Sequence, residues 1–336
     1  MGSARTAFAR AAARAGVLGS IAAVVFLLAG VGTAVVDSLA GASLGGLRAG
    51  LAASSGTDGA VRWQIRVAGD PPAQAAAAAS VLDRMIVPHG ATWTRSVETA
   101  PVDATGPTGP AGVFGAVLLA DDGVPERSAL VSGAWPTDPE AIAAAGADDA
   151  LPATLHSGAA AALGLEPGDL VDLGRSGRLL VVGTWIPIDP NEPAWFGEPA
   201  IATGVVDGGG GPFLVPEEAL LDVPAATIVR WTALVDADAM TPESARSLRA
   251  ALPDVEPALR AQEAIGRDGL SALGALGANL DRLLAGLGAV RAIAPLPVLL
   301  LAFAGFAALA RLAALLGAAR RARRCCCEPA ALRRPG

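Results

Sequence analysis

The chain has 336 residues, of which 52% are hydrophobic and 17% charged, and its mean hydropathy is +0.48. That balance is too apolar for an ordinary soluble protein and too charged for one that lies wholly within a membrane. Residues 37–291 hold 31 acidic and 15 basic side chains, a net charge of −16. Such a segment repels nucleic acid, so no nucleic-acid partner is expected.

The first apolar segment is residues 17–36, which are uncharged and follow Arg5, Arg10 and Arg14. A helix of this length matches the hydrocarbon core of a bilayer, about 30 Å thick. Positive charge before the first span predicts that residues 1–16 are cytoplasmic. A cleaved secretory signal peptide is the alternative, although its apolar core is normally shorter than this one.

Beyond this span the chain is predicted to form a stalk helix at 37–54, where apolar residues recur at helical spacing. Residues 61–67 then alternate, which predicts a strand with one apolar and one polar face. Asp70 and Pro71 are suited to cap and start the helix that follows. A strand at 92–97 completes a strand–helix–strand unit.

A similar unit ends the outer region. Val229, Trp231 and Ala233 mark the apolar face of a strand, and Thr241 with Pro242 predicts the start of a helix that runs to about Leu252. A short strand is expected to begin at Val255. Two such units, at the two ends of residues 55–265, predict one α+β domain that carries an insertion at about 134–224.

The insertion is expected to hold a short helix capped by Thr154 and a β-hairpin. The hairpin strands are 170–173 and 178–185, joined by a glycine-containing turn. Three tryptophans also lie here (Trp135, Trp185 and Trp195), and packing in a core is the expected role for them rather than a platform for a ligand.

Toward the C-terminus, residues 266–291 are predicted to form a second stalk helix that packs on the first. Six apolar residues at spacings of three and four form its packing stripe: Leu273, Leu276, Leu280, Leu283, Leu287 and Val290.

A second apolar segment at 292–317 directly follows this helix. Its first nineteen residues carry no charge, so it is predicted to be a second membrane span. The arginines at 320–324 place the tail, 318–336, in the cytoplasm. Pro295 and Pro297 lie where stalk meets membrane and are candidates for a hinge, although prolines are also common at interfacial helix ends.

Sites for chemistry are not apparent. Without lysine the chain has no P-loop. His156 has no nucleophile-elbow pattern around it, so a surface or helix-capping role is expected. Asp121 and Asp122 are expected to be solvated, and the consecutive cysteines 325–327 lack metal-site spacing. No catalytic, cofactor or metal site is predicted, and the chain is not expected to be an enzyme.

Three strings carry a resemblance to a known family: LVSGAWP (130–136), LPATLHSGAAAALGLEPGDLVDL (151–173) and LVVGTWIPIDPNEPAW (180–195). These strings lie in this order between the two predicted spans. On that basis residues 15–320 resemble the FtsX-like permease family, the membrane subunits of MacB-type ABC transporters. The resemblance implies a MacB-like extracytoplasmic domain on a stalk, moved by a cytoplasmic ABC ATPase subunit that binds the ATP. It further implies a multi-pass protein of the cell membrane, in contact with lipid and expected as a dimer, that exports or extracts lipid, lipoprotein, peptide or drug.

The resemblance also implies more spans than the chain contains, because family members continue past the second one. Residues 318–336 have neither helical periodicity nor apolar length, so an aberrant tail and a chain truncated after the second span are expected. An alternative function is a membrane-tethered extracytoplasmic binding or scaffold protein that works without an ATPase.

Overall fold

A computed structural model describes residues 41–106, 113–206, 209–266 and 268–293, with scattered helical residues between 25 and 38 and between 296 and 314. The two expected spans are described only in part, and the tail and both hinge prolines lie wholly outside the described residues. Within the described part of the chain, no helix combines the length and apolar character needed to cross a membrane. The chain divides into two compact units, of which Leu47–Leu284 is one.

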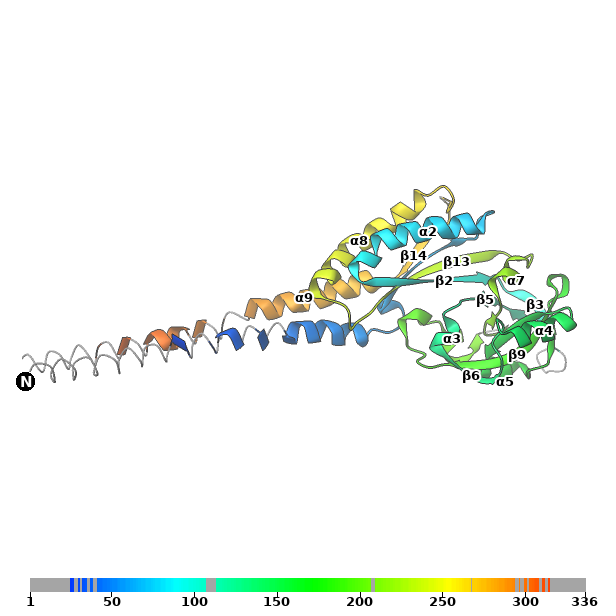
Figure 1. Cartoon of the computed structure of the whole chain (residues 1–336), viewed down its shortest axis with the longest axis horizontal. Helices are drawn as coiled ribbons and strands as arrows, with labels where there is room; N and C mark the ends of the chain where they lie inside the picture. The colour runs from blue at the N-terminus through cyan, green and yellow to red at the C-terminus, as the bar shows by residue number, and fades with distance from the viewer. Residues whose placement is uncertain are drawn as a thin grey trace, which may run out of the picture. The chain divides into compact units, whose positions relative to one another are not determined.

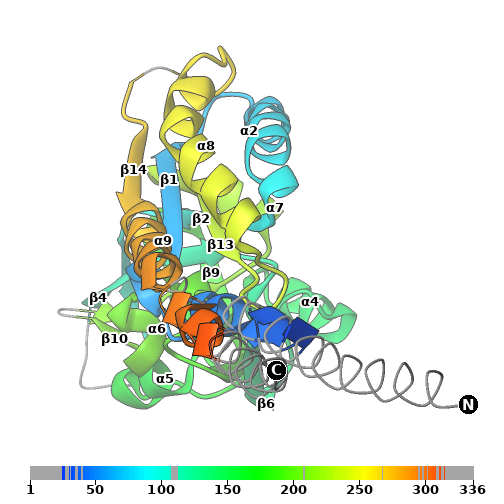
Figure 2. The ribbon, with the colours of Figure 1, turned by 90° about the vertical axis from the view of Figure 1, so that its left-hand side faces the viewer.

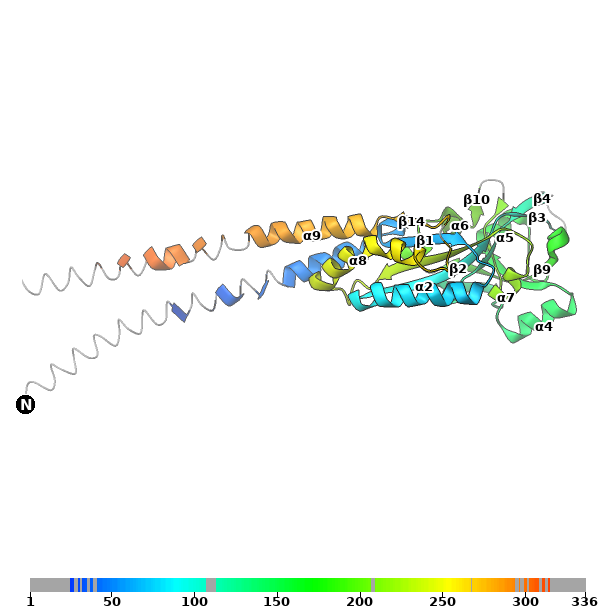
Figure 3. The same ribbon diagram turned by 90° about the horizontal axis from the view of Figure 1, so that it is seen from above.

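The two ends of the Leu47–Leu284 unit together form four paired strands under two helices (Figure 1). In chain order the elements of these two ends are β1 (Ala60–Arg66), α2 (Pro71–Met85), β2 (Ala91–Thr99), β13 (Thr227–Val235), α8 (Pro242–Arg260) and β14 (Ser271–Gly274). We call this part the first half, and the residues between β2 and β13 the second or inserted half. The strands pair antiparallel in the order β2-β13-β1-β14. Helices α2 and α8 pack on one another and cover one face of this sheet (Figures 2 and 3).

Helix caps fix where these two helices begin. The Ala73 backbone N–H donates to the Asp70 carboxylate (3.0 Å), and prolines fill the first two positions of α2. Thr241 and Ser244 form a reciprocal capping box at the start of α8. Both starts lie where Asp70–Pro71 and Thr241–Pro242 predict them.

The second half contains the strands and short helices between β2 and β13. Its strands are β3 (Val102–Thr105), β4 (Val113–Ala116), β5 (Leu118–Ala120), β6 (Ser128–Gly133), β7 (Leu151–His156), β8 (Leu170–Asp172), β9 (Arg178–Pro187), β10 (Val205–Val206), β11 (Gly209–Gly210) and β12 (Phe213–Leu214). Its helices are α3 (Val124–Arg127), α4 (Pro139–Ala147), α5 (Ser157–Leu163), α6 (Pro199–Thr203) and α7 (Glu217–Leu221).

One hydrogen-bonded sheet joins the two halves. Strand β5 pairs with β2 and, on its other side, with β12, which leads on to β7, β9, β8 and β3. The β8–β9 hairpin forms as expected. The inserted part is longer than the predicted 134–224, because β3 and β4 pair with each other and with β8 and β11 rather than with the first half.

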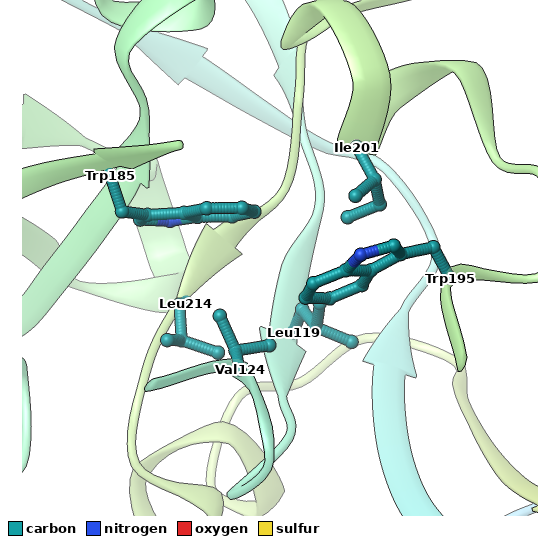
Figure 4. Close-up of a cluster of buried hydrophobic side chains, with 6 residues drawn as sticks. All are labelled: Leu119, Val124, Trp185, Trp195, Ile201 and Leu214. Atoms are coloured by element: carbon teal, nitrogen blue, oxygen red, sulfur yellow. The ribbon is translucent and has the colours of Figure 1, made fainter. Parts of the chain in front are cut away.

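A tryptophan-centred core holds the second half together (Figure 4). Its buried members are Leu119, Val124, Trp185, Trp195, Ile201 and Leu214, with Trp135 packed against them. The Trp185 and Trp195 rings stack with centroids 6.2 Å apart. The prediction that these tryptophans pack in a core is confirmed.

Three local predictions are wrong. Thr154 caps no helix, because β7 runs through it and His156 caps α5 instead. Val255 starts no strand, because α8 continues to Arg260; the partner strand of that unit is β14. Leu273 is not on the stalk helix, because it pairs with Arg62 in β14, and helix α9 (Leu276–Ile293) begins after it.

Candidate functional site

Two helical segments meet at the base of the Leu47–Leu284 unit. Residues 41–52 are helical, and Leu47 and Leu51 are buried on that helix. On α9, Leu276 and Leu280 are fully buried. A Cβ added to Gly50 would lie 2.4 Å from a Leu283 methyl carbon, so glycine allows the helices to approach closely there.

Polar contacts join the two segments to the sheet. The Asn279 side-chain amide donates to Ser54 Oγ (2.6 Å) and to the Asp58 carbonyl (3.0 Å). The Ala275 N–H donates to the Thr57 carbonyl (2.7 Å). We call the contacts of residues 54–59 with residues 274–279 the base junction.

The segment 189–198 of the inserted half lies on the base junction. Gly56 donates its N–H to the Asn191 carbonyl (3.3 Å), and a Cβ on Gly56 would lie 3.1 Å from the Cα of Gly197. A Cβ on Gly274 would meet the Phe196 ring at 3.1 Å. Both glycines have a positive φ (51° at Gly56 and 101° at Gly274), so a side chain at either position would be strained as well as crowded against segment 189–198.

A balanced ion-pair cluster lies on the polar face of the central strands. Arg62 of β1 pairs with Glu198, which also accepts from Arg230 of β13 (3.4 Å). Arg230 in turn pairs with Glu98 of β2. The Arg62 guanidinium donates to Thr232 Oγ1 (3.0 Å) and lies 4.2 Å from the Phe196 ring centroid. Two cations and two anions therefore alternate, and they tie segment 196–198 to three strands.

Burial sets the electrostatics of this cluster. It lowers the pKa of Arg62, against the opposing effect of Glu198. It raises the pKa of Glu98, which the neighbouring Arg230 counteracts. Because a buried charge is stable only when paired, each member depends on the next. The arrangement is suited to mechanical connection between segment 196–198 and the three strands.

A groove of about 770 Å³ lies on the other face of the sheet. Its walls come from the start of α2, the turn after β5, the segment leading into α4, and the segment from β12 into α7. Arg95 of β2 lines it and forms an ion pair with Glu217. Burial raises the pKa of another lining residue, Asp121, although Arg127 beside it opposes the shift.

His156 was considered as a catalytic residue in the sequence, and in the structure it caps a helix. Its Nδ1 accepts a hydrogen bond from the Gly158 N–H (2.9 Å) at the start of α5. Its ring meets Trp185 edge-on, with centroids 5.4 Å apart, and burial lowers its pKa. The predicted capping role is confirmed, whereas its position is buried rather than on the surface.

The residues predicted for stalk packing are only partly brought together. Leu276, Leu280 and Leu287 are buried and Leu283 faces Gly50, whereas Leu273 lies in β14 with 43% of its surface exposed. The side chain of Val290 lies outside the described part. Sequence patterns did not indicate the ion-pair cluster or the groove, because the residues of each come from distant parts of the chain.

No family model and no curated protein matches the chain. Among solved structures, the periplasmic region of MacB from Actinobacillus actinomycetemcomitans is similar at 12% identity and a TM-score of 0.34, covering 69% of this chain and 94% of that one. A domain of a "putative Permease protein" from Porphyromonas gingivalis is similar at 12% identity and a TM-score of 0.34, covering 65% and 89%.

Proposed function

We propose that this chain is the membrane permease subunit of an ABC transporter, with Leu47–Leu284 as its extracytoplasmic domain. Segments 17–36 and 292–317 are the proposed spans, and both termini are cytoplasmic. Support comes from two long uncharged stretches flanked by arginine on the proposed inner side. The acidic charge of residues 37–291 agrees with an outer location, since basic residues concentrate in cytoplasmic loops.

The paired helices at the base carry the proposal. Both chain segments that lead from the domain toward the proposed spans are helical, and they contact one another at Gly50 and Leu283. A domain held by two adjoining helices at one place can be moved as a unit when those helices shift. A single flexible tether would not transmit such a displacement.

The base junction offers a route for that motion into the domain. Residues 54–59 lead directly into β1, residues 274–279 join β14 to α9, and segment 189–198 touches both. We propose that ATP hydrolysis in a cytoplasmic ABC ATPase partner shifts the helix pair. Pro295 and Pro297 are the proposed hinge, and a lipid, lipoprotein, peptide or drug is the proposed cargo of the dimeric transporter.

Purification of the full chain from its own membrane in non-ionic detergent tests this function. An ATP-binding subunit should co-purify in a fixed ratio, and a reporter inserted at residue 150, between α4 and β7, should face outward. A cytosolic reporter at that position would overturn the proposal. Recovery of an envelope protein without an ATP-binding subunit would instead favour the tethered binding or scaffold protein, the second candidate, which the groove supports.

A further inference from the structure

We propose that the groove beside α2 and α7 binds a cationic peptide segment with apolar side chains, supplied by another protein. Neither the membrane spans nor an ATPase enters into this inference, so it goes beyond the permease assignment. It rests on the volume of the groove, the rigidity and apolar character of its walls, and the charges at its rim.

The size and walls of the groove suit a short peptide. Its volume of about 770 Å³ is within the range of about 300–1,000 Å³ that is typical of ligand sites. Five of its lining residues are prolines: Pro71, Pro72, Pro125, Pro136 and Pro216. Their fixed backbone angles make the walls rigid, so little conformational entropy is lost when a ligand binds.

An apolar surface runs beside the prolines. Ile142 on α4 is 50% exposed and lines the groove, as does the partly buried Leu221 of α7. A ligand that covers the exposed Ile142 side chain removes apolar surface from water, which favours binding. The partner therefore needs apolar side chains as well as charge.

The rim charges select a cation. Of the five ionisable residues that line the groove, four are carboxylates and one is Arg95. Asp121 and Glu217 are paired with arginines, whereas Asp122 and Glu218 are exposed and make no ion pair or hydrogen bond in the described structure. Two uncompensated carboxylates at the rim attract basic side chains to the groove.

Helix starts at the groove do not reverse this field. Backbone N–H groups at the starts of α2 and α4 carry partial positive charge. Asp70 accepts from the Ala73 N–H at the first, and Asp138, which precedes α4, accepts from the Trp135 N–H (2.9 Å). A carboxylate thus offsets each start, and the rim remains acidic.

The test uses the full chain in non-ionic detergent and a fluorescein-labelled peptide made of three Leu-Arg-Pro repeats. We expect saturable binding in fluorescence polarisation, weakened as salt screens the charges. The double variant Asp122→Lys with Glu218→Lys should bind at least about tenfold more weakly, since it repels the same side chains. Ile142→Ser should weaken binding without altering its dependence on salt.

Matched controls keep the result specific to the groove. Asp254→Lys with Glu263→Lys makes the same charge change at two exposed acids outside the groove lining and should leave the affinity within about twofold. Ile188→Ser, at a site 69% exposed, is the control for Ile142→Ser. If the Lys variants fold poorly, Asp122→Asn with Glu218→Gln should still weaken binding.

Several outcomes would overturn the inference. The inference is wrong if the peptide shows no saturable binding up to millimolar concentration, or if a Leu-Glu-Pro repeat binds equally well. It is also wrong if the groove variants and the control variants lose the same peptide affinity. Spermine that competes as well as the peptide would point to a small organic cation instead, and would also overturn it.

Discussion

Arg62 shows how one distant segment changes the environment of a residue. Strand alternation assigns it to the polar face of β1, where solvent exposure is expected. In the structure Glu198 and Phe196 cover it, so its side chain is 8% exposed. Those residues lie more than a hundred positions away, and no local pattern reveals the contact. In contrast, Asp70, Thr241 and His156 act within a few residues, and their roles were predictable.

Replacing Arg62 should be costly. Arg62→Met removes a buried cation and leaves the partly exposed Glu198 with only Arg230 as its partner, so it should lower the free energy of unfolding by about 2 kcal/mol. Tryptophan fluorescence during denaturant unfolding measures the change. Arg66→Met, at an exposed position of the same strand, should change it by less than about 0.5 kcal/mol. Adding Glu198→Met to Arg62→Met should restore part of the lost free energy of unfolding. If Arg62→Met and Arg66→Met lower it equally, the buried cluster does not contribute to stability.

His156 should make stability depend on pH. Burial lowers its pKa in the folded state below the ordinary value of 6.5, so the unfolded chain takes up the proton first. The stabilisation is therefore present above pH 6.5 and is lost as pH falls below that value. Protonation of Nδ1 would also remove its hydrogen bond with the Gly158 N–H.

The His156→Asn variant isolates this contribution, because asparagine caps helices without titrating. Between pH 7 and pH 5 the wild type should lose up to about 1 kcal/mol more stability than His156→Asn. His89, Glu98 and Asp121 are shared by both proteins, so their effects cancel in the difference. Parallel stability curves for the two proteins would exclude the role of His156.

At the scale of elements, amphipathic spacing outweighs helix-breaking residues in α8. The helix was predicted to end at about Leu252, yet it continues to Arg260 with Pro253 and Pro257 inside it. Val255 and Leu259 are fully buried, and each contributes about 1.5–3 kcal/mol by burial. Both prolines face solvent, where helix bending is tolerated. Element types were therefore predictable from period and caps, whereas this boundary depended on packing.

The two kinds of proline in α8 should respond oppositely to alanine. Pro253→Ala restores a backbone hydrogen-bond donor in the helix interior, but it also gives the unfolded chain more conformational entropy. The net effect should be a rise of about 1 kcal/mol in the free energy of unfolding. Pro242→Ala should lower it slightly, because proline is favourable at the first helical position. Denaturant midpoints of the two variants check this. A loss of stability in Pro253→Ala would indicate that the proline rings themselves pack in the structure.

At the scale of the whole molecule, the unit Leu47–Leu284 joins the two surfaces with proposed functions through one sheet. The base junction lies where the helical segments enter, and the groove lies where the first half meets the inserted half. Strand β2 carries Glu98 of the ion-pair cluster on one face and Arg95 of the groove on the other. The cluster holds Glu198, whose segment 189–198 lies on the base junction. The sequence predicted the α+β class and the helix pair. It could not predict how β5 and β12 continue the sheet, since short strands with non-local partners carry no distinctive period.

The helix pair at the base is open to a direct chemical test. With the cysteines at 325–327 replaced by serine, Gly50→Cys and Leu283→Cys should form an intramolecular disulfide under mild oxidation, because the Gly50 Cα faces the Leu283 side chain in close contact. Ala49→Cys with Leu283→Cys is the control, since Ala49 is exposed. Non-reducing gel mobility measures the bond. If the helices transmit ATPase-driven motion, the cross-link should also abolish transport until dithiothreitol is added. Equal cross-linking of both cysteine pairs would mean that the two helices slide freely past one another. That result would contradict both the packing of Gly50 against Leu283 and the proposed transmission of motion through the helix pair.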